Sequence, residues 1–428
     1  MISMIILFGV FFLALILGVP IVFSLSLAAL ALLWQMDMFV PELVVQRMFD
    51  GVDSFPMMAI PFFMLAGALM DTGGISIRLV RFSNVLVGWI SGGLAHVAVM
   101  ASIFFAGISG SAVADTTAIG STLIPIMNRR KFDPDFSASV VAAAGVIGPI
   151  IPPSIPMVLY GVIAGQSIGQ LFLAGIVPGL MMGIGLMVMI FFFAKRRGYP
   201  CEKVDLSFST LMRTTIEASG ALVMPIIIVG GILGGVFTAT EAAVVAVVYA
   251  FVIGKFVYRE LTWKGLPEII YRAGLSTGMI LIIVGVANLI GFILAAEQIP
   301  LALSQWFQAT FSSQAAVLLI INIALLIVGC FIDGGSAMII FAPVLLPVVK
   351  QFGIDPVFFG VLMTVNLMIG TITPPVGLSL YIAAGIAKIS LEKISRAIAP
   401  FLLLEVAVLL LITYMPDIVL FLPRLFWK

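Results

Sequence analysis

Apolar stretches recur from one end of the chain to the other and are separated by short polar turns. A run of about 20 apolar residues is long enough, as a helix, to cross the hydrocarbon core of a bilayer. The sequence therefore predicts a helical protein that crosses a membrane many times. The predicted continuous spans are 5–33, 55–70, 170–194, 216–237, 242–257, 276–296 and 398–414. Amphipathic stretches at 72–89 and 301–310 predict helices that lie at the membrane interface.

The first half also contains two shorter apolar arms, 92–106 and 112–127, on either side of a polar tip at 109–111. At 1.5 Å per residue, a helix of about 15 residues is about 23 Å long, less than the roughly 30 Å core. We therefore predict a re-entrant hairpin, with two thin conventional spans as the alternative. Apolar arms around 332–336 predict a second hairpin in the second half.

Two further apolar segments, 137–165 and 358–387, are interrupted by proline. The first carries Gly-Pro-Ile-Ile-Pro-Pro at 148–153, and the second carries Pro374 and Pro375. Proline lacks an N–H group and its ring clashes with the preceding turn, so a regular helix cannot continue through these positions. We predict two discontinuous helices, because irregular backbone at membrane depth occurs where protein or a cavity surrounds it.

The sequence also repeats itself at a spacing of 222 residues. Five prolines between 107 and 178 recur at that spacing without a gap, together with Asp133/Asp355 and Gly148/Gly370. The proline pairs are Pro125/Pro347, Pro134/Pro356, Pro152/Pro374, Pro153/Pro375 and Pro178/Pro400. Because prolines break helices, their shared positions indicate shared architecture, and the chain is predicted to contain a duplicated unit.

Basic residues orient these units, since cytoplasmic loops are enriched in Lys and Arg. Four basic clusters fall on one side of the membrane if each hairpin dips in and returns, and they lie at 129–131, 195–213, 255–264 and 388–396. Nine spans then result, with the N-terminus cytoplasmic, the C-terminus periplasmic, and Arg424 and Lys428 as exceptions to the rule. An odd linking span makes the second unit inverted relative to the first.

The predicted fold class is an all-α polytopic membrane protein, an inverted repeat with two re-entrant helical hairpins and two discontinuous helices. Residues 1–195 form the first unit, with scaffold helices, a hairpin and a broken helix. Residues 196–238 form a cytoplasmic loop and a linking span, and residues 239–428 form the second unit with the same parts.

The composition excludes several functional classes. Charged residues make up 10% of the chain, far below the roughly 25% of a soluble protein, and the net charge of +1 gives no reason to expect a nucleic-acid partner. A single histidine, His96, and scattered carboxylates provide no zinc site, acidic Mg²⁺ cluster or nucleophile with its base, so no enzyme is expected. The chain lacks a P-loop motif, and we expect no cofactor apart from a coupling ion.

The hairpin tips and helix breaks are the predicted chemical sites, because unwound carbonyls and half-helix ends can replace the hydration shell of an ion. Glycine permits close backbone approach, and Ser and Thr supply hydroxyl oxygens for a hard cation such as Na⁺. We predict two Na⁺ sites, one for each tip and its break. The predicted ion-binding residues are Ser109, Gly110, Ser111, Gly145, Gly148, Pro152, Gly329, Asp333, Ser336, Gly370, Thr371 and Thr373. Ordinary helix packing and kinking is the alternative for the glycines and prolines.

Asp115 and Asp333 are the charges that most need an explanation, since a carboxylate near the bilayer centre costs on the order of 2.5 to 3.5 kcal/mol. Each could bias a cation site or hold the tip backbone through hydrogen bonds. The predicted substrate-binding residues are Asp115, Thr116, Ser154, Asn366 and Pro375. Glu241, three residues after Thr238, is expected to cap a helix instead.

Four motifs resemble one known family, the large membrane subunit of tripartite ATP-independent periplasmic (TRAP) transporters. They are GISGSAVAD at 107–115, GPIIPPS at 148–154, TATEAA at 238–243 and TPPVG at 373–377, and the similarity covers essentially the whole chain. The resemblance implies an elevator-type fold in the bacterial inner membrane. It also implies Na⁺-driven uptake of an organic acid delivered by a periplasmic binding protein, with a small four-helix membrane subunit as partner.

Within this family the overall appearance of the chain resembles the sialic-acid branch, and a C4-dicarboxylate or another sugar acid remains open. Two Na⁺ moving with one monoanion would carry one positive charge inward, which a potential of 100 mV favours by about 2.3 kcal/mol. The alternative is a self-sufficient Na⁺ or H⁺ carboxylate symporter, which uptake without a binding protein would support.

Overall fold

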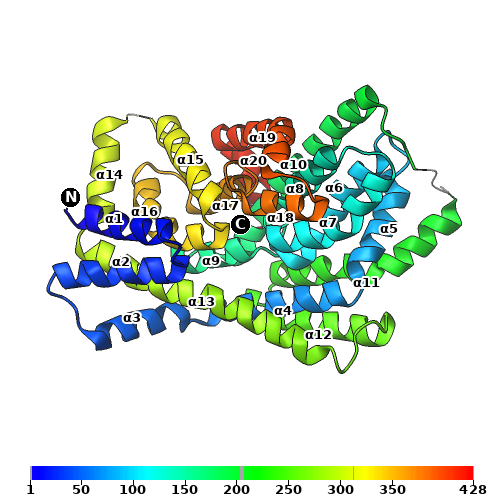
Figure 1. Ribbon diagram of the computed structural model, residues 1–428. Helices are drawn as coiled ribbons and strands as arrows, with labels where there is room; N and C mark the ends of the chain where they lie inside the picture. Colours follow the sequence, from blue (N-terminus) through cyan, green and yellow to red (C-terminus); the bar gives the residue numbers. More distant parts are fainter. Residues whose placement is uncertain (1, 203–206, 312, 428) are drawn as a thin grey trace.

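The computed structural model describes residues 2–202, 207–311 and 313–427, and it is α-helical (Figure 1). The helices of the first half are α1 (Ile2–Ile16), α2 (Ile21–Gln35), α3 (Pro41–Val52), α4 (Ala59–Thr72), α5 (Ile75–Val87), α6 (Gly93–Ser109), α7 (Ala112–Arg129), α8 (Pro134–Gly145), α9 (Ile155–Ala164) and α10 (Ile168–Arg197). After α11 (Phe208–Leu233) follow α12 (Ala239–Val252), α13 (Leu266–Ala296), α14 (Ile299–Thr310), α15 (Gln314–Phe331), α16 (Gly334–Gln351), α17 (Pro356–Gly370), α18 (Leu378–Ala387), α19 (Leu391–Tyr414) and α20 (Pro416–Phe426).

Six of the seven predicted continuous spans are helices long and apolar enough to cross a membrane. The predicted span at 5–33 is wrong, because the chain forms two helices there, α1 and α2, which pack against each other. Gly18 has a φ of +80° and Pro20 directly precedes α2, so the helix ends between them. The prediction failed because the apolar run continues on both sides of this break.

Both predicted hairpins are present as helix pairs, α6–α7 and α15–α16, joined at 110–111 and 332–333. Their arms contain 17 or 18 residues, which is longer than predicted. Among the described residues, α15 and α16 also qualify by length and composition as possible spans. Re-entrance therefore stays a prediction.

The duplication is visible in the helix boundaries. α7 begins at residue 112 and α16 at residue 334, while α8 begins at residue 134 and α17 at residue 356, so both pairs are separated by 222 residues. The Pro152–Pro153 and Pro374–Pro375 bonds, separated by the same number, are both cis. Each predicted discontinuous helix is interrupted at these bonds, between α8 and α9 and between α17 and α18.

The helices form two groups (Figure 1). A lower layer contains α2–α4, α12 and α13, with α1 packed on α2, and an upper group contains α6–α10 and α15–α19. In the upper group, every residue from Phe136 to Gly145 in α8 and from Val357 to Gly370 in α17 is buried. A helix that is apolar on all sides belongs in the interior, so the first halves of the broken helices form the core of this group.

Candidate functional site

The tip of the first hairpin packs against the first helix break. Gly110 has a φ of +60°, and a Cβ atom there would lie 2.6 Å from the carbonyl oxygen of Pro153. Only glycine combines that conformation with so close an approach. The side chain of Ser111 caps α7 by accepting a hydrogen bond from the N–H of Ala114 at 3.4 Å. Sequence and structure therefore agree that tip and break form one unit.

The second tip packs against the second break in the same way. The N–H of Gly377 donates a hydrogen bond of 3.1 Å to the carbonyl of Cys330. A Cβ atom on Gly370 would lie 2.5 Å from the Cα atom of Gly329, so the two backbones touch. Asp333 caps α16, because its carboxylate accepts hydrogen bonds from the N–H groups of Gly335 at 3.0 Å and Ser336 at 3.3 Å.

Both tips meet at one cavity of about 730 Å³, here called the tip cavity. Its wall in the upper group includes Ser109, Gly110, Ser111, Asp333 and Thr371, which are all predicted ion-binding residues. Three helices, α7, α9 and α16, begin at or beside this wall and turn their N-terminal ends toward it. Helix N-termini carry partial positive charge, which favours an anion nearby, and at the N-terminus of α16 the carboxylate of Asp333 already accepts two of the N–H groups.

Asp115 lies behind the first tip and does not line the tip cavity. It is fully buried, and one carboxylate oxygen accepts a hydrogen bond from the hydroxyl of Ser109. Its other oxygen, Oδ2, lacks a hydrogen-bond partner within the described residues, as does the hydroxyl of Thr116. A Cβ atom at Gly148 would lie 2.2 Å from Oδ2, and one at Gly145 would lie 2.2 Å from the Thr116 hydroxyl. Two oxygen atoms that lack a hydrogen-bond partner in the described residues thus face the helix break between α8 and α9. Oxygen ligands of this kind suit a hard cation.

The remaining predicted residues lie in the breaks or in the helices beside them, and they do not line the tip cavity. Ser154 caps α9, and Asn366 donates hydrogen bonds to the backbone and side chain of Asn322 at 3.0 and 2.9 Å. The hydroxyl of Thr373 donates to the Ile369 carbonyl at 2.8 Å, whereas Pro375 is exposed. Pro152 and Ser336 are buried. The Asn366 contacts join α17 to α15, whereas the Ser154 and Thr373 contacts are local to the breaks.

The opposite wall of the tip cavity comes from the lower layer and was not predicted. It includes Gly67 and Asp71 of α4 and Arg272 and Ser276 of α13. The Nε atom of Arg272 lies 2.6 Å from an oxygen of Glu268, one helical turn earlier. In the sequence this pair has the spacing of an ordinary surface ion pair, so nothing distinguished Arg272 as a cavity residue.

Solved structures support the architecture. The chain matches the YdaH transporter of Alcanivorax borkumensis with a TM-score of 0.65 and 14% identity, covering 86% of each chain. It matches MtrF of Neisseria gonorrhoeae with a TM-score of 0.60 and 11% identity, covering 89% of this chain and 85% of the other. At such low identities these likenesses show the helical fold alone.

Comparison of sequences is more informative. The chain is 44% identical over 416 residues to the isethionate TRAP transporter permease protein DctMQ of Oleidesulfovibrio alaskensis, spanning 97% of this chain and 66% of that protein. It is 41% identical over 412 residues to the sialic acid TRAP transporter large permease protein SiaM of Vibrio cholerae, spanning 96% of both. It is 40% identical to the C4-dicarboxylate TRAP transporter large permease protein DctM of Rhodobacter capsulatus, spanning 99% of both.

These relatives are named as permeases rather than enzymes, and the family model described as "Tripartite ATP-independent periplasmic transporter, DctM component" matches residues 8–418. The match extends across both copies of the 222-residue repeat and includes both tips and both breaks. The chain therefore belongs to the DctM family, the large permease component of TRAP transporters.

Proposed function

We propose that this chain imports an organic acid by Na⁺-coupled secondary transport, with the acid bound in the tip cavity. The observation that carries the proposal is the convergence of two hairpin tips and three helix N-termini on that cavity. The relatives are named for isethionate, sialic acid and C4-dicarboxylates, which are all anions. Sialic acid is the first substrate to test, and the class is that of small organic anions.

The two Na⁺ sites are proposed between each tip and its break. In the first, Asp115 Oδ2 and the Thr116 hydroxyl offer oxygens without a hydrogen-bond partner in the described chain. In the second, the backbone around Gly370 and Thr371 unwinds beside Gly329. Bound Na⁺ would stabilise both tips and thereby complete the wall of the tip cavity, which couples the ion to the acid.

The mechanism we propose is an elevator, in which the upper group moves past the lower layer with ion and acid bound. The tip cavity lies between the two groups, so relative movement would carry its upper wall away from Arg272. A periplasmic binding protein would deliver the acid, and a small four-helix subunit would complete the membrane part. We place the protein in the bacterial inner membrane with its N-terminus inside and its C-terminus outside.

Uptake into proteoliposomes tests this function. Purified large and small subunits should take up a labelled acid only with an inward Na⁺ gradient and a loaded binding protein. The panel should contain sialic acid, a C4-dicarboxylate and isethionate. Uptake that is independent of Na⁺ would overturn the coupling, and uptake without the binding protein would establish the self-sufficient symporter instead.

A further inference from the structure

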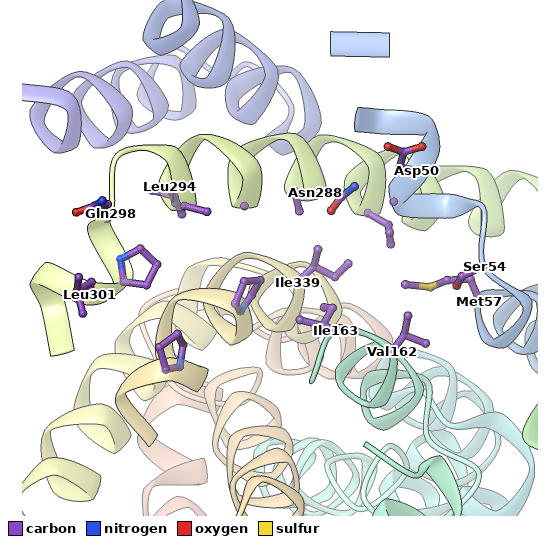
Figure 2. Close-up of a pocket in the computed structure, with 18 of the residues that line it drawn as sticks. Asp50, Ser54, Met57, Val162, Ile163, Asn288, Leu294, Gln298, Leu301 and Ile339 are labelled. Carbon is purple, nitrogen blue, oxygen red and sulfur yellow. The ribbon is translucent and has the colours of Figure 1, made fainter. Parts of the chain in front are cut away.

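A second cavity of about 920 Å³ lies between the lower layer and the upper group (Figure 2). Asp50, Asn288 and Leu301 belong to the wall formed by α3, α13 and α14. Ile163 and Ile339 lie on the facing wall, which α9 and α16 form. None of the residues predicted for ion or substrate binding lines this second cavity. It is therefore a separate feature of the described chain.

One face of α13 connects the two cavities. Residues 272, 276 and 280 line the tip cavity, and residues 284, 287, 291 and 294 line the second cavity. A spacing of three or four residues keeps side chains on the same face of a helix. The other wall of the second cavity includes α16, the arm that begins beside Asp333. A molecule bound there would contact the lower layer and this hairpin at once.

The polar side chains in the lining of the second cavity are one carboxylate, two hydroxyls and three amides, those of Asp50, Ser54, Ser304, Asn288, Gln298 and Gln351. Asp50 is the one charged residue in its lining, and no ion pair to it occurs in the described structure. Asn288 donates its Nδ2 hydrogen to the Arg47 carbonyl at 2.8 Å, which leaves its side-chain oxygen as an acceptor. The hydroxyls of Ser54 and Ser304 lack partners within the described residues, and Ser304 is only 2% exposed. Asp50 is an exposed residue at the edge of the cavity, and Arg47, one turn earlier in α3, lies outside the lining with its guanidinium over the Phe292 ring. The lining itself therefore carries a single negative charge, which disfavours the transported acid.

Apart from these polar residues, which include Gln298 and Gln351, the lining is apolar, with leucine, isoleucine, valine and proline side chains from both walls. A volume of about 920 Å³ is within the range of roughly 300 to 1,000 Å³ that is typical of small-molecule sites. We propose that the second cavity binds a cationic amphiphile, whose ammonium group lies at Asp50 and whose apolar body lies between α13 and α16, and that the bound amphiphile holds the two groups of helices together. The proposed binding does not depend on the proposed function, whereas the inhibition of transport by the bound amphiphile rests on that function.

Three compounds of matched shape test the binding: 4-phenylbutylammonium, 4-phenylbutanol and 4-phenylbutyrate. Their affinities for the purified protein are measured by calorimetry. The ammonium compound should bind about 10-fold more tightly than the alcohol, because a hydrogen bond to a charged group is stronger than a neutral one, and the carboxylate should bind most weakly. Equal affinities, or tightest binding of the carboxylate, would overturn the proposal.

Two pairs of variants locate the site. Asp50→Asn should reduce the affinity for the ammonium compound to that for the alcohol, whereas Asp53→Asn, an exposed control outside the lining, should leave it unchanged. Gly291→Phe should fill the cavity, because Gly291 lines it and a Cβ atom there meets nothing within 4 Å. Gly278→Phe, at an equally open position of α13 outside both linings, is the control. If each variant has the same affinity for the ammonium compound as its control, the binding site lies outside the second cavity.

Transport supplies a separate readout. With wild-type protein, 4-phenylbutylammonium should lower the maximal rate of Na⁺-driven uptake without changing the KM for the acid, and Asp50→Asn should relieve this inhibition. Competition with the acid would place the compound in the tip cavity and contradict the proposal. If the wild-type protein shows no uptake, the proposed function fails, while the calorimetric comparison still decides the binding.

Discussion

At the scale of single residues, Asp333 has two separable roles, as the cap of α16 and as a charge on the wall of the tip cavity. Asparagine caps helices as well as aspartate but has no charge. We expect Asp333→Asn and Asp333→Ala both to abolish Na⁺-dependent uptake while the protein still inserts. Asp355→Asn is the matched control, since Asp355 caps α17 and does not line the cavity. If Asp333→Asn takes up the acid at the wild-type rate, Asp333 serves only as the cap of α16 and its charge is not required.

Gly148 tests the first ion site at the same scale. A methyl group there would lie 2.2 Å from Asp115 Oδ2, so Gly148→Ala must displace the carboxylate from its place beside the break. We expect the Na⁺ concentration for half-maximal uptake to rise about 10-fold or more, as for the loss of a charged ligand. Gly230→Ala, where a Cβ atom meets nothing within 4 Å, should transport normally. An unchanged Na⁺ dependence in Gly148→Ala would remove Asp115 from the ion site.

At the scale of elements, the polar junction after α10 predicts a pH effect on stability. Tyr199 stacks on Phe132 with ring centroids 4.6 Å apart and donates a hydrogen bond of 2.6 Å to Asp133. Burial and this carboxylate raise the pKa of Tyr199. Because its folded pKa lies above the unfolded value of about 10, its stabilising effect is present below pH about 10 and is lost at higher pH.

Tyr199→Phe removes the hydrogen bond to Asp133 and the one that the Tyr199 hydroxyl accepts from Arg197 at 3.2 Å, each worth about 1 kcal/mol. The variant should therefore have a lower thermal unfolding temperature at neutral pH and a flatter decline of that temperature above pH about 10. Tyr381→Phe, at an exposed position, is the control. Unfolding temperatures in detergent across this pH range provide the measurement. If the unfolding temperatures of the wild-type protein and of Tyr199→Phe fall in parallel as the pH rises, Tyr199 is not the group responsible for the pH effect.

The elements also show how far sequence reasoning extends. Features that depend on local chemistry were predictable. The tip at 109–111 and both proline breaks occur where expected. Glu241 caps α12 as expected, because its carboxylate accepts a hydrogen bond of 2.7 Å from the N–H of Thr238. The break near Pro20 was missed, because an uninterrupted apolar run outweighed one glycine and one proline. The convergence of Ser111 and Asp333 on one cavity, with Arg272 opposite them, depends on packing between distant segments, which local patterns do not encode.

At the scale of the whole molecule, the duplicated unit connects the two ion sites to the electrical behaviour of transport. If each tip and break holds one Na⁺, two cations move with each acid. A monovalent acid such as sialic acid then carries one net positive charge inward, and a potential of 100 mV, inside negative, favours its uptake by about 2.3 kcal/mol. The equilibrium accumulation ratio should accordingly rise about 50-fold for every 100 mV.

Potassium diffusion potentials, set with valinomycin in proteoliposomes at a fixed Na⁺ gradient, measure this dependence. A divalent C4-dicarboxylate moving with the same two Na⁺ carries no net charge, so its accumulation should not respond to the potential. The comparison also separates the sites, because Gly148→Ala should reduce the response of the monovalent acid if the first site no longer fills. If the accumulation of a monovalent acid does not change with the membrane potential, the acid moves with a single Na⁺. Only one of the two tips would then hold a coupling ion.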